Sequence, residues 1–394
     1  MSTIIGTGIS TKLDSFTACK EAALTAYYQI GKNNPNVIII FISTIFDQEV
    51  VIKGVKSIIR DVPLIGCSSI GSISIYGSCK DSVTAFIISS DSIMFSCGIS
   101  HDISKNSRLA GHNASRHASN SMSSSKQLYI MFSDSLTGNN ADVLRGSQEA
   151  LGTSFPIIGG GACDKAYFKK AYQYADNEIL TDSVVGLLLS GDVKFGTGQS
   201  SGWQPIGKPH KVTRVKSNIV KEIDKKIAVE LYEEYFDKSF LELRDEGICR
   251  LGINYPIGIY TDYSKKYLTR VPIAIEENGW LVLNADIHEE ETISLMIGDK
   301  ESVLESAKEA VSEAMNNIKD LKIKFAIIFS DISRLLLLRK DAYKEIAIVK
   351  ERIGKNTPIV GCYTFGEYTY FNVTESKNRC NFNNQSISIA LFTE

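Results

Sequence analysis

The sequence predicts an α/β fold with two related modules, whose mixed sheets are built from repeated strand–helix–strand–Gly-loop–strand units. A Pro–apolar–apolar–Gly core occurs three times along the chain. An apolar run of strand length precedes each copy by roughly thirty residues, which suits a βαβ crossover, and a further apolar strand follows each copy. The three copies are Pro63-Leu64-Ile65-Gly66-Cys67, Pro156-Ile157-Ile158-Gly159-Gly160 and Pro358-Ile359-Val360-Gly361-Cys362.

The strands and helices of the repeat follow from local patterns. Helical spacing of apolar residues predicts crossover helices over Val50 to Ile59 and Asp341 to Ile353. The expected preceding strands are Val37 to Ser43, Gln127 to Ser133 and Lys324 to Ser330, and the last two share a Phe-Ser-Asp ending. Two or three α/β sheets, or one mixed sheet in each half, would follow.

The middle of the chain has a different pattern. Two hairpins are expected, at 212–223 and 271–283, the second with Asn-Gly at its turn. Asp224 is placed to cap a helix that runs to Tyr235, and an apolar stripe predicts a long helix over Glu301 to Ile318. Two prolines and two glycines after residue 201 mark a loop. We therefore predict domains at 1–215 and 216–394.

Composition excludes several classes of protein. The 394 residues are 43% hydrophobic and 22% charged, so the chain can bury real cores. The net charge of −2 gives no electrostatic footprint for nucleic acid, and the apolar runs are too short for membrane insertion. Eight scattered cysteines without a CxxC pair fit a reducing compartment, and no secretory signal begins the chain. A cytoplasmic protein is expected.

The Gly-rich segments are the first candidates for a ligand site. Glycine lets a backbone approach a ligand closely and present its N–H groups, although strand-end turns would explain the same glycines. No Walker A loop or complete GxGxxG fingerprint is present. Three such loops at strand ends favour one or two ligand clefts. The predicted ligand-binding residues are Gly66, Cys67, Ser68, Gly159, Gly160, Gly161, Asp164, Trp203, Gly361, Cys362 and Glu367.

Cysteine and acidic side chains leave alternatives open. Cys67 and Cys362 occupy matching repeat positions, where a thiol is either a nucleophile or a small apolar residue. Asp164 and Glu367 close their Gly-rich loops and would bind a ligand amine or cap a helix. Neither a paired-carboxylate spacing nor a Gly-x-Ser-x-Gly elbow is found, so no catalytic residue is predicted.

Histidine is the third candidate type. His210 lies at the predicted domain boundary near Trp203, where one imidazole beside aromatic groups would serve as an axial ligand to haem iron. His112 is our second choice. The alternative is that each is an ordinary surface or hydrogen-bonding histidine.

Taken together, these motifs resemble the FIST family. Its N-terminal module is similar to residues 65–71, 158–162, 195–198, 202–207, 212–215 and 218–235. Its C-terminal module is similar to residues 361–367, followed by Asn383-Asn384-Gln385 and Ser386 to Phe392. Three departures occur: Ser72 follows Gly71 where the family often has Glu, Cys163-Asp164 stands where the family often ends in Gly-Asp, and the stretch from Ser330 to Leu335 lacks the family's cysteine.

The resemblance implies a non-enzymatic ligand-binding sensor. Such a protein would act through a separate partner, such as a histidine kinase or a cyclic-di-GMP enzyme, and a homo-oligomer is compatible with it. Similar stand-alone proteins bind haem and sense nitric oxide, which implies haem on His210. Two alternatives stay open: a sensor of an amino-acid-like metabolite held by Asp164 or Glu367, and a thiol-dependent hydrolase or transferase.

Overall fold

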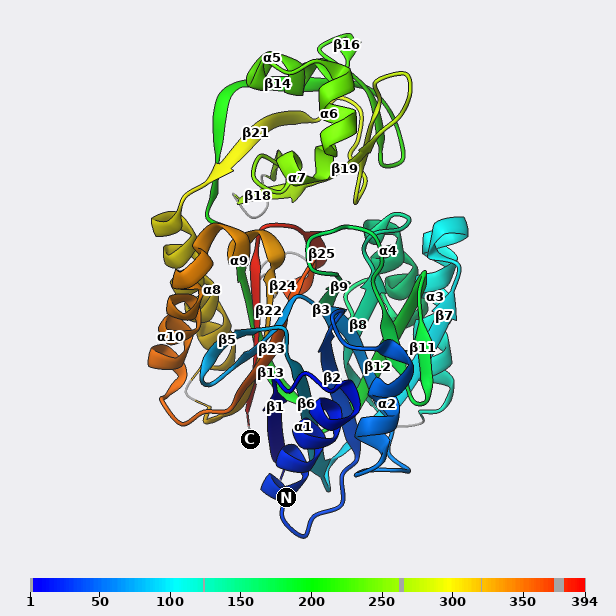
Figure 1. Cartoon of the computed structure of the whole chain (residues 1–394), viewed down its shortest axis with the longest axis vertical. Coiled ribbons are helices and arrows are strands. Elements are labelled where there is room, and N and C mark those ends of the chain that lie inside the picture. The colour runs from blue at the N-terminus through cyan, green and yellow to red at the C-terminus, as the bar shows by residue number, and fades with distance from the viewer. Residues whose placement is uncertain (1–2, 123–124, 262–265, 320, 372–378, 394) are drawn as a thin grey trace.

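Three α/β units form a body, and an insertion of short helices and strands stands on one end of it (Figure 1). The computed structural model describes residues 3–122, 125–261, 266–319, 321–371 and 379–393. Both termini lie at the end of the body opposite the insertion. Within the described ranges, no helix combines the length and the apolar character needed to cross a membrane.

The three units have one order of elements, and they meet along a common axis. Unit 1 comprises β1 (Thr3–Ser10), α1 (Ser15–Gln29), β2 (Val37–Ser43), α2 (Gln48–Lys56), β3 (Leu64–Ser69), β4 (Gly71–Ser74), β5 (Gly77–Lys80) and β6 (Val83–Ser90). Unit 2 comprises β7 (Ile93–His101), α3 (Ile103–Asn120), β8 (Lys126–Asp134), α4 (Asn140–Leu151), β9 (Ile157–Ala162), β10 (Gln173–Ala175), β11 (Glu178–Leu180) and β12 (Ser183–Gly191). Unit 3 comprises β13 (Lys194–Ser200), α8 (Lys300–Ile318), β22 (Ile323–Asp331), α9 (Ile332–Leu338), a 3-10 turn (Arg339–Asp341), α10 (Ala342–Ile353), β23 (Ile359–Thr364), β24 (Glu367–Phe371), β25 (Arg379–Asn383) and β26 (Ile387–Thr393).

Each unit donates a hairpin to the sheet of another unit. The parallel pair of strands at the centre of each sheet comes from one unit, and the two strands at one edge come from a different unit. The three sheets have the strand orders β1-β6-β2-β3-β10-β11, β7-β12-β8-β9-β24-β25 and β13-β26-β22-β23-β4-β5. This cyclic exchange ties the three units into one body.

A glycine on the first strand of each unit lets a helix pack directly onto it. Gly8, Gly98 and Gly198 lie on β1, β7 and β13, and a Cβ on any of them would lie 2.0 Å from a helix carbonyl oxygen. The carbonyls belong to Ala22, Ala114 and Ala310 of α1, α3 and α8. Small residues on both sides therefore set the close approach of helix and sheet.

The insertion interrupts unit 3 between β13 and α8. It comprises β14 (Trp203–Lys216), β15 (Ile219–Ile223), β16 (Lys226–Ile227), α5 (Glu230–Phe236), α6 (Phe240–Glu246), α7 (Ile248–Gly252), β17 (Ile257–Thr261), β18 (Lys266–Arg270), β19 (Pro272–Ile275), β20 (Leu281–Leu283) and β21 (Thr292–Gly298). Strands β14 and β21 pair with each other and connect the insertion to the body (Figure 1).

The predicted α/β class and repeated unit are confirmed, and the unit occurs three times. Both predicted hairpins and the long helix, α8, are present. The helix predicted from Asp224 is wrong in its start, because Asp224 lies in a left-handed turn before β16 and α5 begins at Glu230. The boundary between residues 215 and 216 stays a prediction.

Candidate functional site

The three Gly-rich segments come together at the axis of the body, as parts of β3, β9 and β23. Cys67, Gly160 and Cys362 occupy equivalent positions, each beside a phenylalanine of the neighbouring parallel strand. These three phenylalanines contact one another in T-shaped, edge-to-face arrangements. Their ring centroids lie 5.6 Å (Phe41–Phe132), 6.4 Å (Phe41–Phe329) and 5.8 Å (Phe132–Phe329) apart.

The glycines on these strands serve packing. A Cβ on Gly66, Gly159 or Gly361 would lie 1.9 Å from a carbonyl oxygen of the adjacent parallel strand. At each of these glycines the neighbouring strand leaves no room for a ligand, and the three phenylalanine rings fill the axis of the body. The predicted ligand-binding residues Gly66, Gly159, Gly160, Gly161 and Gly361 are therefore gathered in one place, but all are buried.

The thiols at the axis are also buried. Cys67, Cys163 and Cys362 have at most 1% of their surface exposed. Burial raises the pKa of the Cys362 thiol well above its ordinary value, and the adjacent Cys67 thiol adds to the shift. A thiol in this setting holds its proton, whereas a nucleophile must present an accessible thiolate. The geometry gives no support to a thiol-dependent hydrolase or transferase at these cysteines.

The remaining predicted residues on the Gly-rich loops take part in internal hydrogen bonds. Asp164 accepts four backbone N–H groups, from Tyr167 to Lys170, and so holds its own loop. Glu367 accepts hydrogen bonds from Thr364 Oγ1 and Ser386 Oγ. Burial raises the pKa of Glu367 well above its ordinary value, and the nearby Asp331 adds to the rise. Ser68 Oγ donates to the Cys163 carbonyl at 2.9 Å.

His210 lies in the insertion and is nearly buried, at 6% exposure. Its Nδ1 is 2.8 Å from Asp224 Oδ2. Burial alone would raise the pKa of Asp224, but hydrogen bonds from Lys211 N–H and His210 hold it below its ordinary value. The carboxylate therefore orients the imidazole, and Nε2 has no hydrogen-bond partner among the described residues.

The surroundings of His210 do not fit a porphyrin. The adjacent cavity measures about 130 Å³ and is lined largely by Lys208, Lys226, Glu230 and Glu234. Ligand pockets typically have about 300–1,000 Å³ and predominantly apolar walls. His112 is half-buried on α3, in a different part of the molecule. The structure therefore gives no support to a haem site at His210.

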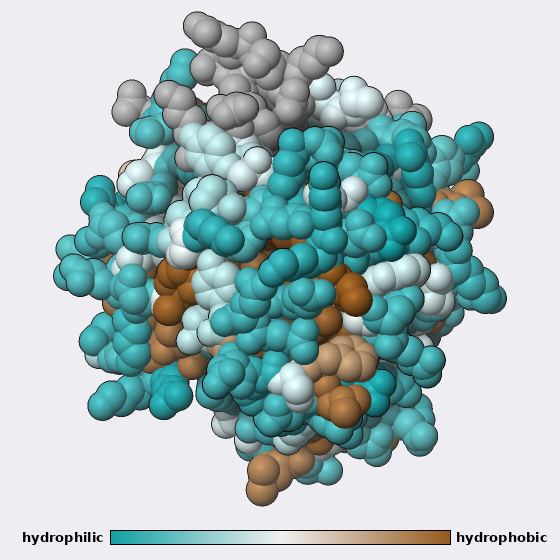
Figure 2. Space-filling view, turned by 90° about the horizontal axis from the view of Figure 1, so that it is seen from above, coloured by the Kyte–Doolittle hydropathy of each residue, from teal (hydrophilic) through white to brown (hydrophobic). Residues whose placement is uncertain are grey.

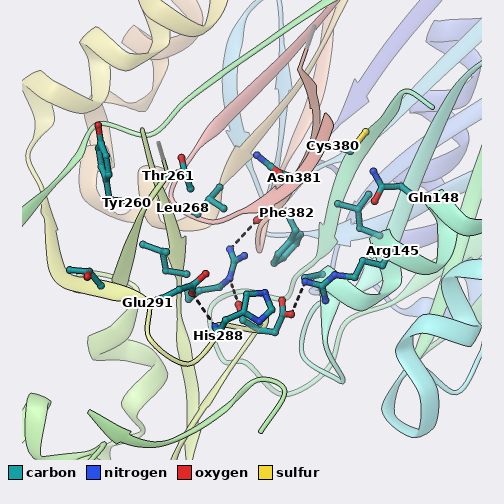
Figure 3. A pocket seen from close by; sticks show the side chains of 16 residues that line it. Arg145, Gln148, Tyr260, Thr261, Leu268, His288, Glu291, Cys380, Asn381 and Phe382 are labelled. Carbon is teal, nitrogen blue, oxygen red and sulfur yellow. Dashed lines mark hydrogen bonds and ion pairs between the residues drawn. The ribbon is translucent and has the colours of Figure 1, made fainter. Parts of the chain in front are cut away.

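A cavity of about 710 Å³ lies between the insertion and the body. Figure 3 shows Tyr260 and Glu291 of the insertion on one side and Arg145 and Gln148 of α4 on the other. The other lining residues are Ala141, Leu144, Ile259, Thr261, Leu268, Arg270, Asp286, His288, Thr292, Cys380, Asn381 and Phe382. Apolar and hydrogen-bonding side chains alternate around it, as in a typical ligand pocket.

Arg145 spans this cavity from the body to the insertion. Its guanidinium is 2.8 Å from Asp142 of the same helix and 2.6 Å from Asp286, which follows β20. Arg145 is 36% exposed, whereas Asp286 is 9% exposed. This ion pair is the charged link between the two sides of the cavity (Figure 3).

A seam of polar groups lies directly behind the cavity. Arg270 of β18 donates to the carbonyl oxygens of Asp286 and Phe382, at 2.9 and 3.0 Å. Thr269 N–H donates to Asn383 Oδ1 at 2.7 Å. Asn284 Nδ2 donates to Asn384 Oδ1 at 2.7 Å, and Asn284 accepts the Asn140 N–H at 3.4 Å. We call Asn140, Asn284, Asn383 and Asn384 the amide seam.

A second, smaller cavity lies next to the first along β18. It measures about 170 Å³ and contains Trp203, the one predicted ligand-binding residue that lines either of these two cavities. Trp203 Nε1 donates to the Asn254 carbonyl at 3.3 Å. Leu268 and Asn381 line both spaces, so β18 forms a shared wall.

The outer face of the insertion offers a contrast. Seen from above, it is mostly hydrophilic, and apolar side chains show in several separate groups between the hydrophilic ones and at the rim of the view (Figure 2). In the parts of the chain that the structure describes, no group of three or more His, Cys, Asp or Glu side chains is arranged to hold a metal ion.

Comparisons with known proteins agree with these features. The FIST N domain model matches residues 36–226, and the FIST C domain model matches residues 228–369. The chain therefore belongs to the FIST family, whose domains are associated with signal-transduction sensor proteins.

Other relatives are distant. An uncharacterised protein of Methanocaldococcus jannaschii is 29% identical over 170 residues, which are 41% of this chain and 33% of that protein. The chain thus spans about a third of that relative's length. Two solved structures align over nearly the whole of both chains: cyanuric acid hydrolase from A. caulinodans (TM-score 0.40, 7% identity, 99% of each chain) and a chorismatase (TM-score 0.38, 8% identity, 100% of each).

Sequence reasoning missed the cavity because its lining has no common motif. Arg145, Arg270 and Asp286 come from three separate elements, and only the fold brings them together. One signal was present: the Asn383-Asn384-Gln385 segment, which carried part of the family resemblance, supplies two members of the amide seam.

Proposed function

We propose that the protein is a signal-transduction sensor whose small-molecule ligand occupies the 710 Å³ cavity between the insertion and the body. The observation that carries this proposal is the position of the cavity, since it is bounded by the body and by the insertion, whose two chain connections to the body run through β14 and β21. A partner such as a histidine kinase or a cyclic-di-GMP enzyme would read the result.

A ligand in this position would bias how the insertion sits on the body. The two connections pass through Gly202, which has φ +86°, and through Gly298 at the end of β21. A ligand that contacts α4 on one side and β17 or β18 on the other favours the arrangement in which both contacts are made. The surface presented to a partner would then change with occupancy.

Haem with nitric oxide stays a prediction with a spectroscopic test. A Soret band in haem-supplied protein that disappears in His210→Ala would support His210 as the axial ligand. A band that persists in that variant but disappears in His112→Ala would transfer the role to His112. Absence of haem uptake would remove this version and leave the cavity proposal standing.

The cavity proposal is tested by filling the space. Ala141 lines the cavity as the second residue of α4, so Ala141→Trp places an indole inside it. A metabolite library is screened by thermal shift against the wild type, and hits are repeated on the variant. We expect hits to raise the Tm of the wild type and to lose that effect in Ala141→Trp.

The repeat supplies a matched control. Glu49 is the second residue of α2, at the corresponding place in unit 1, and it is exposed. Glu49→Trp should keep the ligand response. A response that survives Ala141→Trp, or the absence of any stabilising metabolite, would contradict the proposal.

A further inference from the structure

The first strand of each unit lies at an edge of its sheet, where its outer backbone groups pair with no further strand of the described residues. In unit 1, Gln29 of α1 bonds both outer groups of Thr7 on β1: its Oε1 accepts the N–H at 3.0 Å, and its Nε2 donates to the carbonyl at 2.7 Å. In unit 3, Asn317 of α8 donates to the Thr197 carbonyl at 2.8 Å, and a glutamate of the same helix accepts the Gln199 N–H at 3.3 Å. A bonded backbone group cannot pair with another strand, so helix side chains block the edges of β1 and β13.

The corresponding edge in unit 2, on β7, is blocked at one point. His117 of α3 accepts the Ile99 N–H at its Nδ1, over 3.3 Å. In the described part of the chain, no other side chain bonds to the strand backbone between residues 94 and 100. The Cys97 carbonyl, which directly precedes Gly98 and so corresponds to the blocked carbonyls of units 1 and 3, stays open. The edge of β7 is therefore the most open of the three.

The helices explain this difference. The glycine of each first strand that contacts a helix alanine marks the corresponding positions in the three units. Seven residues after that alanine, α1 has Gln29 and α8 has Asn317, whereas α3 has ended and the chain continues with Ser121. Glutamine and asparagine carry a donor and an acceptor on one amide, and the shorter serine side chain leaves the centre of the β7 edge open.

The composition of β7 also suits pairing with a further strand. Sheet edges in soluble proteins usually prevent such pairing with charged side chains, proline or a bulge. β7 has nine residues, Ile93–His101, without Lys, Arg, Asp, Glu or Pro, and its register with β12 is regular throughout. Met94 is 51% exposed, and Phe95, Cys97 and Ile99 are half-buried. The strand therefore offers apolar side chains beside its open backbone.

We propose that the outer edge of β7 binds the same edge of a second copy of this chain, in antiparallel orientation. Such a pair is self-complementary, because each strand offers the other the same series of outward N–H and C=O groups. Two copies of β7 do not repel each other, since the strand has no acidic or basic Lys, Arg, Asp or Glu side chain. β7 lies with α3 along one side of the body (Figure 1). The two unit 2 sheets would join into one continuous sheet with the β7 strands at its centre.

The test measures self-association of the full chain by sedimentation velocity over a range of protein concentrations. Met94→Lys places a charge on the β7 edge, and Ser121→Gln supplies the residue type that blocks the β1 edge in unit 1. Each variant has a control. Leu241→Lys adds the same charge at a side chain that is 56% exposed but lies on α6 of the insertion. Ser121→Ala changes the same position without adding an amide. Thermal unfolding checks that every variant is folded.

We expect the wild type and both controls to dimerise with the same Kd. Met94→Lys and Ser121→Gln should each raise the Kd about tenfold or more, which corresponds to about 1.4 kcal/mol. Either variant carries the test if the other does not fold. A wild type that stays monomeric at every concentration would overturn the proposal and leave the edge to a strand of a different protein. A dimer whose Kd is unchanged in both variants would also overturn it, because its interface would lie elsewhere.

Discussion

The three units meet at the axis of the body, whereas units 2 and 3 meet the insertion at the cavity, and the two places differ in their chemistry. At the axis, three phenylalanines and close strand contacts fill the space. Below the insertion, amides and ion pairs surround a hollow of about 710 Å³. The glycines of the repeated motif therefore lie in the tightly packed region. The residues that line the cavity belong to no repeated sequence motif.

A buried arginine of α9 holds the chain segment that enters the insertion, and its removal should have the largest effect. Arg334 is fully buried, pairs with Glu345 at 2.6 Å and donates to the Ser201 carbonyl at the start of the insertion. Arg334→Met would leave Glu345 as an unpaired buried charge, so we expect a loss of about 3–5 kcal/mol in the free energy of unfolding by urea. The double variant Arg334→Met with Glu345→Leu should recover much of that loss. Equal losses in both proteins would mean that the hydrogen bonds to Ser201 and Val303, rather than the charge pair, dominate.

The close packing of the axis can be broken by one methyl group. Gly361→Ala places a Cβ 1.9 Å from the Ile328 carbonyl, so β22 and β23 must separate. We expect a loss of about 3 kcal/mol from overpacking, read from the urea midpoint. Gly31→Ala is the control: its Cβ would contact nothing within 4 Å, and only its φ of +63° imposes a cost, of about 1 kcal/mol. Equal losses at the two positions would refute the packing role of Gly361.

Burial of Glu367 makes the stability of the folded chain depend on pH. Because its pKa is raised in the folded state, the folded chain binds the proton more tightly than the unfolded chain does. The stabilising contribution is therefore complete below the ordinary carboxyl pKa of 4.5 and is lost as the pH rises toward the folded-state pKa. Glu367→Gln should gain stability relative to the wild type between pH 4.5 and pH 8, measured by urea unfolding at several pH values. A difference that does not change with pH would contradict a raised pKa.

The axis also contains a polar residue whose replacement should help. Both amide atoms of Gln173 are buried without a hydrogen-bond partner among the described residues, next to Cys67 on β3. Gln173→Met keeps the length of the side chain and removes two unsatisfied groups, so we expect about 1 kcal/mol of added stability in thermal unfolding. Gln148→Met, at the cavity, is the comparison, because the Gln148 amide donates to Thr153 and its loss should not stabilise. Destabilisation by Gln173→Met would indicate that an ordered water satisfies the amide.

Sequence patterns predicted the body far better than the cavity. The Pro–apolar–apolar–Gly repeat marked where β3, β9 and β23 begin, but the prediction that its glycines form loops at the strand ends was wrong. The glycines lie inside these buried parallel strands, where they allow close contact with the neighbouring strand. The same glycines suggested a ligand cleft, since a glycine at a tight contact and one beside a ligand look alike in sequence. The cyclic exchange of hairpins could not be predicted, because a short strand such as β10 carries no mark of the sheet it joins. For the same reason, Arg145 and Asp286, over a hundred residues apart, gave no sign of their contact.

The smallest effect on stability is expected at the cavity itself, where Arg145 carries the link to the insertion. Its guanidinium is partly exposed, so Arg145→Gln should cost less than about 1 kcal/mol in global unfolding. The local consequence should be larger than the global one. With the ion pair to Asp286 lost, amide hydrogen exchange should accelerate in residues 284–288 and 381–384, while the axis strands β3, β9 and β23 keep their protection. Arg214→Gln removes a more exposed ion pair elsewhere in the insertion and should leave both segments unchanged. Uniform acceleration throughout the body would mean that the insertion and the axis unfold as one unit, and the contrast between a rigid axis and an adjustable cavity would fail.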